Sequence, residues 1–127
     1  MDTLSNVLIS LKNAGAVSKE KINVPFSKLT LSILEEMKNE GFVKAVHPNQ
    51  SSYSIEVVLA YDDNKDHKVR EVKRISKPGR RVYYKITDIK KIKNGFGQVF
   101  LSTPQGIMTG RAARAKNTGG EALFEIF

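Results

Sequence analysis

The sequence predicts an α+β protein of two small lobes, residues 1–63 and residues 64–127. The first half holds two segments with apolar residues at helical spacing, followed by segments in which apolar and polar residues alternate. The second half consists mostly of short apolar segments separated by turn residues. Residues 1–63 hold 6 Lys or Arg and 8 Asp or Glu, whereas residues 64–127 hold 15 and 5. We therefore expect an α-β-α-β-β first lobe and a basic, mostly β second lobe with one short helix.

The first expected helix carries four apolar residues on one face, Leu4, Val7, Leu8 and Leu11. Gly15 follows them and is expected to end the helix, because glycine readily adopts the left-handed conformation that terminates helices. A short strand is then expected in which Ile22 and Val24 alternate with polar neighbours, and Pro25 ends it.

The second expected helix has start and stop signals. Ser27 suits the N-cap position, and Gly41 supplies a left-handed residue after the last turn, so that Phe42 folds back on the helix. Its apolar face is expected to consist of Leu29, Ile33, Leu34 and Met37.

Two strands are expected after this helix, over residues 42–47 and residues 53–61, with residues 48–52 as the turn. Alternation places Tyr53, Ile55, Val57, Leu59 and Tyr61 on one face of the second strand. Residues 62–67 are polar and are expected to form a linker. Short strands follow it, with a brief helix around residues 109–116.

Composition excludes several classes of protein. The chain has no cysteine, so it has no disulfide framework, thiolate metal site or cysteine nucleophile. No apolar stretch approaches the roughly 18 to 20 residues that a membrane span needs, and the amino terminus lacks the pattern of a signal peptide. His47 and His67 lie in a turn and in the linker, without catalytic or metal-ligand partners at suitable spacing. We expect a cytoplasmic protein that is not an enzyme and has no metal, cofactor or membrane partner.

A basic balance favours a polyanionic partner. The net charge is +8, and it lies almost entirely in the second lobe. A membrane surface would call for a basic amphipathic helix, but Pro-Gly and Asn-Gly turns interrupt the basic stretch. A DNA-binding regulator would call for a helix-turn-helix pair in the basic half, which the sequence does not predict. Folded RNA fits better than either.

The strongest candidate site is the stretch from residue 68 to residue 93, with eleven basic residues and two acidic ones. Pro78-Gly79 at its centre predicts a type II turn that displays Lys77, Arg80 and Arg81. Cations of this kind bind phosphates by releasing counterions, and Tyr83 or Tyr84 can stack on a base. The alternative is a solvated basic surface with the tyrosines packed inward.

The next candidate stretch begins with Asn94-Gly95, which predicts a hairpin. It ends in a turn with hydroxyl and amide groups at Ser102, Thr103, Gln105 and Gly106. Neutral donors and acceptors can bond base edges and 2′-hydroxyls, which a lysine patch cannot discriminate. Taken alone, the sequence at this position is that of an ordinary turn.

The third candidate is Gly119-Gly120-Glu121. The two glycines permit a close backbone approach or a positive φ. Glu121 is a carboxylate in a basic lobe, so its repulsion of phosphates must be offset, and hydroxyls or amides of a neighbouring loop could do so by donating to it. The alternative is a Schellman-type helix end before a closing strand.

Taken together and in order, these stretches resemble the family of ribosomal protein eight of the bacterial small subunit. The resemblance rests on residues 75–83, residues 94–109 and residues 119–121, and extends to residues 2–14, 24–28 and 40–43. It implies a two-lobe α+β protein that binds the central domain of small-subunit ribosomal RNA early in assembly, beside neighbouring small-subunit proteins. It also implies a monomer when free, and its own messenger RNA as a further candidate partner.

The resemblance also implies which residues bind RNA. The principal site is Ser102, Thr103, Gln105, Gly106, Gly119, Gly120 and Glu121. The basic turn contributes Lys77, Arg80 and Tyr83, and a second stretch of RNA meets Lys12, Asn13, Ser27 and Lys28. The chain departs from the family pattern at several positions; among them, Pro104 stands where serine is usual and Ser10 where arginine is common.

Overall fold

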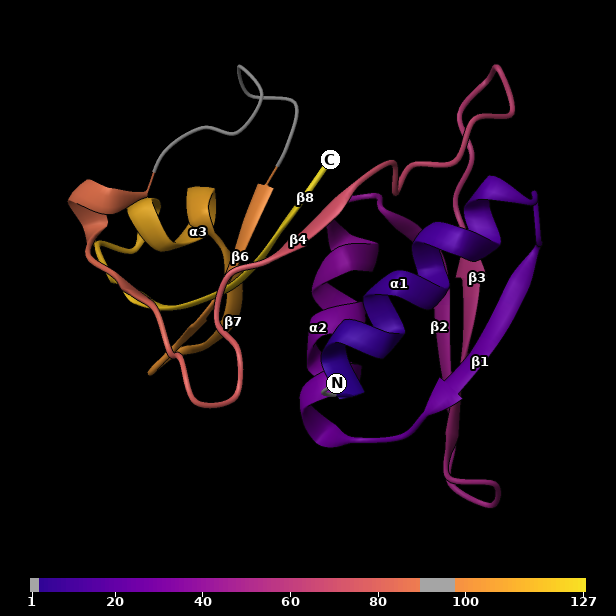
Figure 1. Ribbon diagram of the computed structural model, residues 1–127, viewed down its shortest axis with the longest axis horizontal. Coiled ribbons are helices and arrows are strands. Elements are labelled where there is room, and N and C mark those ends of the chain that lie inside the picture. The colour runs from indigo at the N-terminus through magenta and orange to yellow at the C-terminus, as the bar shows by residue number, and fades with distance from the viewer. Residues whose placement is uncertain (1–2, 90–97) are drawn as a thin grey trace. The chain divides into compact units, whose positions relative to one another are not determined.

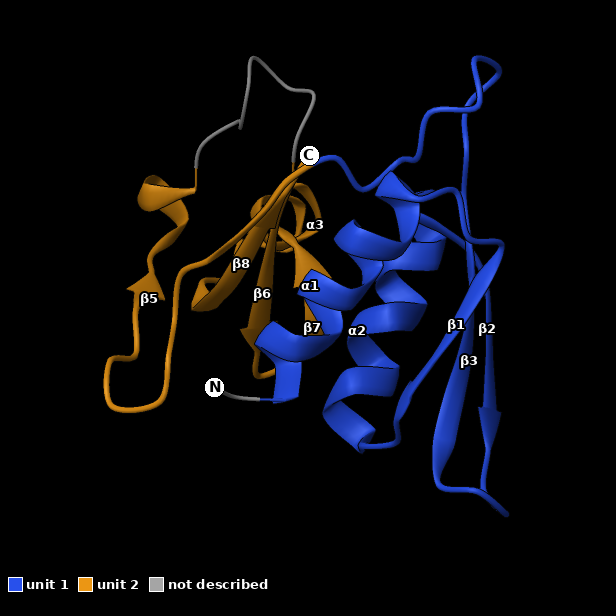
Figure 2. Cartoon of the chain, turned by 45° about the vertical axis from the view of Figure 1, so that its right-hand side comes forward, with its two compact units in different colours: residues 1, 3–70 blue, residues 2, 71–127 orange. Residues whose placement is uncertain are grey.

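The computed structural model describes residues 3–89 and 98–127 (Figure 1). They form two compact units, residues 3–70 and residues 71–127 (Figure 2). Residues 64–70, which the sequence assigned to the second lobe, fold with the first unit. The expected linker is a turn, because the Asp62 carboxylate accepts hydrogen bonds from the N–H groups of Asn64 and Asp66, at 2.9 Å and 3.0 Å. Tyr61 and His67 then form a β-bridge that returns the chain to the unit.

The first unit has the predicted order of helix, strand, helix, strand and strand. Its elements are α1 (Thr3–Ala16), β1 (Lys21–Pro25), α2 (Lys28–Asn39), β2 (Val43–Asn49) and β3 (Ser54–Leu59). The strands form an antiparallel sheet of three in the order β1-β3-β2. Both helices lie on one face of this sheet (Figures 1 and 2).

Helix α1 buries the four apolar residues that the sequence predicted, Leu4, Val7, Leu8 and Leu11. The prediction that Gly15 ends the helix is wrong, because α1 continues to Ala16 and the left-handed residue is Ser18, with φ 59°. Gly15 instead allows close packing. A Cβ atom at Gly15 would lie 2.3 Å from Nδ1 of His67, so no larger residue fits there without a shift.

Helix α2 begins and ends as predicted. The Ser27 hydroxyl caps it by accepting a hydrogen bond of 3.0 Å from the Thr30 N–H. At the other end Gly41 has φ 85°, and the Phe42 N–H donates to the Met37 carbonyl at 2.9 Å. These contacts form a Schellman motif, which satisfies carbonyl groups that the last turn leaves without partners.

The buried face of α2 differs from the prediction at one position. Its buried residues are Thr30, Ile33, Leu34 and Met37. Leu29, which the spacing placed among them, is 48% exposed. Thr30 tolerates burial instead, because its hydroxyl accepts a 2.8 Å hydrogen bond from the Ser27 hydroxyl.

Strand β3 buries Ile55, Val57 and Leu59 as predicted. The two tyrosines expected on the same face lie outside the strand. Tyr53 has a left-handed backbone with φ 49° and is 77% exposed, so its placement on the buried face is wrong. Tyr61 is half-buried, and its hydroxyl donates to the backbone oxygen of Lys19. The turn before β3 covers residues 50–53, because β2 continues to Asn49.

The second unit is mostly β with one short helix, as predicted. Its strands are β4 (Val72–Arg74), β5 (Tyr83–Tyr84), β6 (Gln98–Thr103), β7 (Gly106–Thr109) and β8 (Gly120–Ile126), with a 3-10 helix η1 (Ile86–Asp88) and the helix α3 (Gly110–Ala115). They form an antiparallel sheet of five strands. Strand β6 pairs along one edge of β8, and β4 and β5 both pair along the other. The candidate site lies where β5 and β6 pair with the start of β8, one on each side.

Helix α3 lies within the predicted range 109–116 and starts at a cap, where the Thr109 hydroxyl accepts a hydrogen bond from the Ala112 N–H. It shares a buried cluster with the sheet, made of Ile89, Val99, Leu101, Met108, Ala113 and Ala122. The hairpin predicted at Asn94-Gly95 lies outside the described residues. Within residues 3–89 and 98–127, no helix has the length and apolar character needed to cross a membrane.

Candidate nucleic-acid interface

Residues 77–81, here called the basic turn, are an excursion from one edge of β8. Before the turn, the Ser76 N–H donates to the Ala122 carbonyl at 3.1 Å, and after it the Ala122 N–H donates to the Val82 carbonyl at 2.9 Å. The segment between β4 and β5 therefore stops pairing with β8 at Ala122 and resumes its pairing at the same residue. All residues of the basic turn are exposed.

The predicted type II turn at Pro78-Gly79 is confirmed. Gly79 has φ 81°, the left-handed value that this turn requires at its third residue. Lys77 and Arg80 flank it and exchange two backbone hydrogen bonds of 2.9 Å each. The basic turn thus holds the side chains of Lys77 and Arg80 on an ordered backbone.

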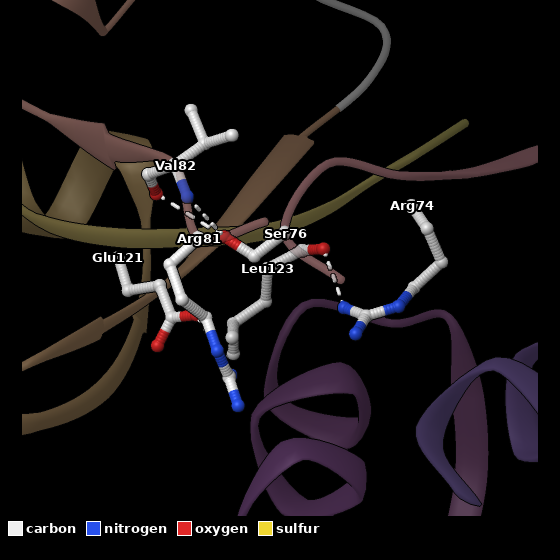
Figure 3. A network of polar contacts seen from close by, with 6 residues as sticks. All are labelled: Arg74, Ser76, Arg81, Val82, Glu121 and Leu123. Atoms are coloured by element: carbon white, nitrogen blue, oxygen red, sulfur yellow. Dashed lines mark hydrogen bonds and ion pairs between the residues drawn. The ribbon is translucent and has the colours of Figure 1, made fainter. Parts of the chain in front are cut away.

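Ser76 anchors the base of the basic turn (Figure 3). Its side chain is fully buried, and its hydroxyl accepts from the Val82 N–H at 2.9 Å and donates to the Val82 carbonyl at 3.2 Å. Ser76 is a functional residue that was not predicted from the sequence. A hydroxyl residue directly before a charged Pro-Gly turn is the signal that could have identified it.

Not every cation of the basic stretch faces solvent. Arg74 is half-buried, and its Nη1 donates to the Leu123 carbonyl at 2.7 Å (Figure 3). This contact ties β4 to β8, so Arg74 contributes to the fold of the second unit. At least one of the eleven basic residues in this stretch therefore stabilises the fold.

Arg81 forms an ion pair across the sheet edge. Its Nη1 lies 3.1 Å from Oε2 of Glu121, the second residue of β8 (Figure 3). From the sequence, hydroxyls or amides of a neighbouring loop were expected to offset the Glu121 charge. In the structure a guanidinium takes this place, and a charge-assisted hydrogen bond of this kind is stronger than a neutral one.

The two glycines before Glu121 allow a close backbone approach on both sides of β8. A Cβ atom at Gly119 would lie 2.4 Å from the Tyr84 carbonyl oxygen, and one at Gly120 would lie 2.3 Å from the Ser102 carbonyl oxygen. Neither glycine has a positive φ; the left-handed residue here is Asn117, with φ 57°. A Schellman end of α3 and a close approach by the glycines, which the sequence left as alternatives, therefore both occur.

Three side chains form a row across neighbouring strands, here called the cross-strand row. Tyr83 on β5 pairs with Glu121 on β8, and Glu121 pairs with Ser102 on β6. Residues directly opposite one another share a face of the sheet. The neighbouring positions Leu101 and Ala122 join the buried cluster with α3, so the row occupies the face away from that helix.

The two adjacent tyrosines of β5 point in opposite directions. Tyr83 is 69% exposed, whereas Tyr84 packs against the buried cluster. Burial raises the pKa of Tyr84, and the negative charges of Glu125 and Asp88 add to the shift. Of the two tyrosines that the sequence offered for base stacking, the structure therefore exposes Tyr83.

The turn between β6 and β7 uses one of its two hydroxyls internally. The Thr103 hydroxyl accepts from the Gln105 N–H at 3.1 Å and donates to the Gly106 carbonyl at 2.8 Å. The Ser102 hydroxyl has no hydrogen-bond partner within the described residues and is half-buried. Pro104 lies at the exposed tip of this turn, where its missing N–H leaves no gap in the hairpin.

The amino-terminal candidates belong to the first unit. Asn13 lines an open depression of about 540 Å³ near the end of α1, together with Ser10, Lys19, Lys21 and Asn23 among others. Lys28 is exposed at the start of α2, and Lys12 is half-buried. The Ser27 hydroxyl, by contrast, is engaged in the helix cap.

Comparisons with known proteins place the chain in one family. The family model described as Ribosomal protein S8 matches residues 2–127. The small ribosomal subunit protein uS8 of Bradyrhizobium sp. (strain ORS 278) is 42% identical over 99% of this chain and 97% of its own length. The proteins of the same name from Afipia carboxidovorans and Geotalea daltonii are 40% and 39% identical, with the same coverage. The chain therefore belongs to the ribosomal protein S8 family.

Proposed function

We propose that the second unit binds folded ribosomal RNA of the small-subunit central domain and organises its folding during assembly. As a member of the S8 family, the chain is a structural component of the small ribosomal subunit and is not an enzyme. In a bacterium this subunit lies in the cytoplasm. The finer proposal, which RNA is bound and by which residues, rests on the surface of the second unit.

One observation carries the proposal: the basic turn and the cross-strand row adjoin on β8. The turn leaves β8 at Ala122, and the row crosses it at the preceding residue, Glu121. Lys77 and Arg80 on the turn contact phosphates and contribute affinity that depends on salt. Neutral groups beside them contact base edges and 2′-hydroxyls, which distinguish one folded RNA from another.

The secondary structure of the second unit favours RNA over duplex DNA. Within residues 71–89 and 98–127, the only α-helix is α3, which has 6 residues. Reading the major groove requires a longer recognition helix or a two-stranded ribbon that enters the groove. The exposed cations Lys77 and Arg80 lie on a turn, a form that suits the irregular shape of folded RNA.

We extend the proposal to the first unit, where Lys12, Asn13, Ser27 and Lys28 contact a second stretch of RNA. The exposed Lys28 and the depression beside Asn13 support this role. Ser27 would contribute through its backbone and through the start of α2, since its hydroxyl already caps the helix.

A salt titration of RNA binding tests the proposal. Lys77→Ala and Arg80→Ala should each weaken binding to a central-domain RNA fragment and lower the salt slope by roughly 0.7 to 0.9. Lys38→Ala removes an exposed cation from α2 and serves as the matched control. Equal affinity of the wild-type chain for this fragment, for a scrambled RNA and for duplex DNA would contradict the proposal.

A further inference from the structure

The ion pair between Arg81 and Glu121 divides the cations of the basic turn into two kinds. The Arg81 side chain is 55% exposed and shares a 3.1 Å contact with Glu121, whose side chain is only 17% exposed. Lys77 and Arg80 carry no ion pair within the described residues. The charge of Arg81 is thus already matched by a carboxylate of the protein, while the other two cations are open to phosphates.

Glu121 occupies the centre of the cross-strand row. Tyr83 lies beside it on one neighbouring strand and Ser102 on the other. An ionised carboxylate has two oxygens with about four acceptor sites, and one Arg81 contact leaves others unoccupied. The Glu121 side chain lies on the same face of the sheet as the exposed Tyr83 ring and the Ser102 hydroxyl, which makes no hydrogen bond within the described residues.

A phosphate at this position would face two penalties. It would be repelled by the Glu121 carboxylate, and taking the Arg81 guanidinium for itself would leave that carboxylate mostly buried without its partner. A group with an N–H or O–H donor faces neither penalty, because it can donate to Glu121 while the ion pair stays intact. The electrostatics of the row thus favour hydrogen-bond donors over anions.

We propose that Arg81 is a positioning residue that holds Glu121 as a neutralised acceptor, which selects nucleotide groups with hydrogen-bond donors and excludes phosphates. The groups of this class on RNA are the exocyclic amino groups of bases and the ribose 2′-hydroxyls. This inference rests on the proposed RNA-binding function of the second unit. It assigns affinity for phosphates to Lys77 and Arg80, and selectivity to the Arg81–Glu121 pair.

The test compares four variants, Arg81→Ala, Arg80→Ala, Glu121→Gln and the double variant Arg81→Ala/Glu121→Gln, each checked for folding by circular dichroism. Two ligands are used: a central-domain RNA fragment, and inorganic polyphosphate, which has phosphates but no bases or ribose. Arg80→Ala is the matched control, because it removes an exposed cation one residue away.

Loss of a phosphate contact and loss of a positioning residue should have different effects on binding. Arg80→Ala should lower the salt slope for the RNA fragment by roughly 0.7 to 0.9, whereas Arg81→Ala should leave the slope unchanged and weaken binding about tenfold. Glu121→Gln should bind polyphosphate about two- to fivefold more tightly, since it frees Arg81 for anions. The double variant should lose this gain.

Two results would overturn the inference. One is a fall in the salt slope for Arg81→Ala equal to that for Arg80→Ala, which would make Arg81 a direct phosphate contact. The other is unchanged polyphosphate affinity in Glu121→Gln. Failure of the proposed function has a different signature: the wild-type chain would then show no preference for the RNA fragment over scrambled RNA, while the polyphosphate measurements would still report on phosphate exclusion.

Discussion

Gly120 and the carbonyl group of Ser102 lie against each other where β8 begins and β6 nears its end. A Cβ atom at Gly120 would meet the Ser102 carbonyl oxygen at 2.3 Å and the Cγ2 atom of Thr103 at 3.0 Å. A carbonyl of the backbone cannot move aside as the end of a flexible side chain can. Glycine therefore allows the two strands of the cross-strand row to lie at their observed separation.

Gly120→Ala should destabilise the protein by about 1 to 3 kcal/mol, the usual cost of forcing extra volume into packed structure. It should also weaken RNA binding, because Glu121 and Ser102 would move apart. Urea denaturation and binding to a central-domain RNA fragment measure the two effects. Lys116→Ala, an exposed neighbour in sequence, is the control and should change stability by less than about 0.5 kcal/mol. A Gly120→Ala protein with wild-type stability would show that the strands can separate without cost.

Ser76→Ala should destabilise the second unit by about 1 to 3 kcal/mol, since it leaves the partly buried N–H of Val82 without the hydroxyl that now accepts its hydrogen bond. The basic turn loses the contact at its base, so RNA affinity should fall although no cation is removed. Thermal unfolding and RNA binding check both effects. Ser52→Ala removes an exposed hydroxyl and should alter neither. A destabilised variant with unchanged RNA affinity would mean that the Pro-Gly turn orders itself.

Ser102→Ala and Thr103→Val should separate recognition from stability. The Ser102 hydroxyl is uncommitted in the described chain, so its loss should reduce discrimination between cognate and scrambled RNA by about 1 to 3 kcal/mol at unchanged stability. The Thr103 hydroxyl makes two hydrogen bonds within the turn, so Thr103→Val should lower the melting temperature. The reverse assignment of the two effects would refute this division of roles.

The first unit should lose stability in acid through Asp62. Backbone hydrogen bonds from Asp66 and Asn64, with the nearby charges of Arg70 and Lys68, hold the pKa of Asp62 below the usual value of an aspartate carboxyl against the opposing effect of burial. Because the folded-state pKa is the lower one, this stabilisation is complete above the unfolded-state value and is lost as pH falls through the folded-state value.

Replacing Asp62 tests this pH dependence. The difference in free energy of unfolding between the wild-type protein and Asp62→Asn should be constant near neutral pH and shrink below about pH 4. Urea denaturation at a series of pH values measures it, and Asp63→Asn controls for the loss of one negative charge from the same turn. A difference that stays constant down to pH 2 would contradict the assignment.

Local signals in the sequence predicted the parts of the fold that depend on neighbours in the chain. The cap at Ser27 and the left-handed Gly41 are examples, because each is set by a hydrogen bond to a residue within about five positions. One of the errors has a distant cause. Gly15 has the sequence context of a helix end, but its lack of a side chain makes room for His67, some fifty residues away. Periodicity alone could not supply that contact.

The candidate site also combines features that the local sequence predicted with features that depend on distant residues. The Pro78-Gly79 turn and the charge of its flanking residues were predictable, since they depend on residues in sequence. The pairing of Arg81 with Glu121 joins residues 40 positions apart, and it exists only because β5 and β8 are neighbours. The sequence indicated that the Glu121 charge needed an offset, but the identity of its partner follows only from the topology of the sheet.

The hydrogen bonds of Ala122 to both ends of the basic turn have a consequence for variation. Because β8 and the hydrogen bonds of Ser76 define the strand register on either side of the loop, we expect residues 77–80 to tolerate changes of length and sequence without a shift of any strand, while Arg81 remains paired with Glu121. Changes in this loop should therefore leave the strands beside it in place. The reach of this protein toward its ligand can therefore evolve independently of the sheet that supports it.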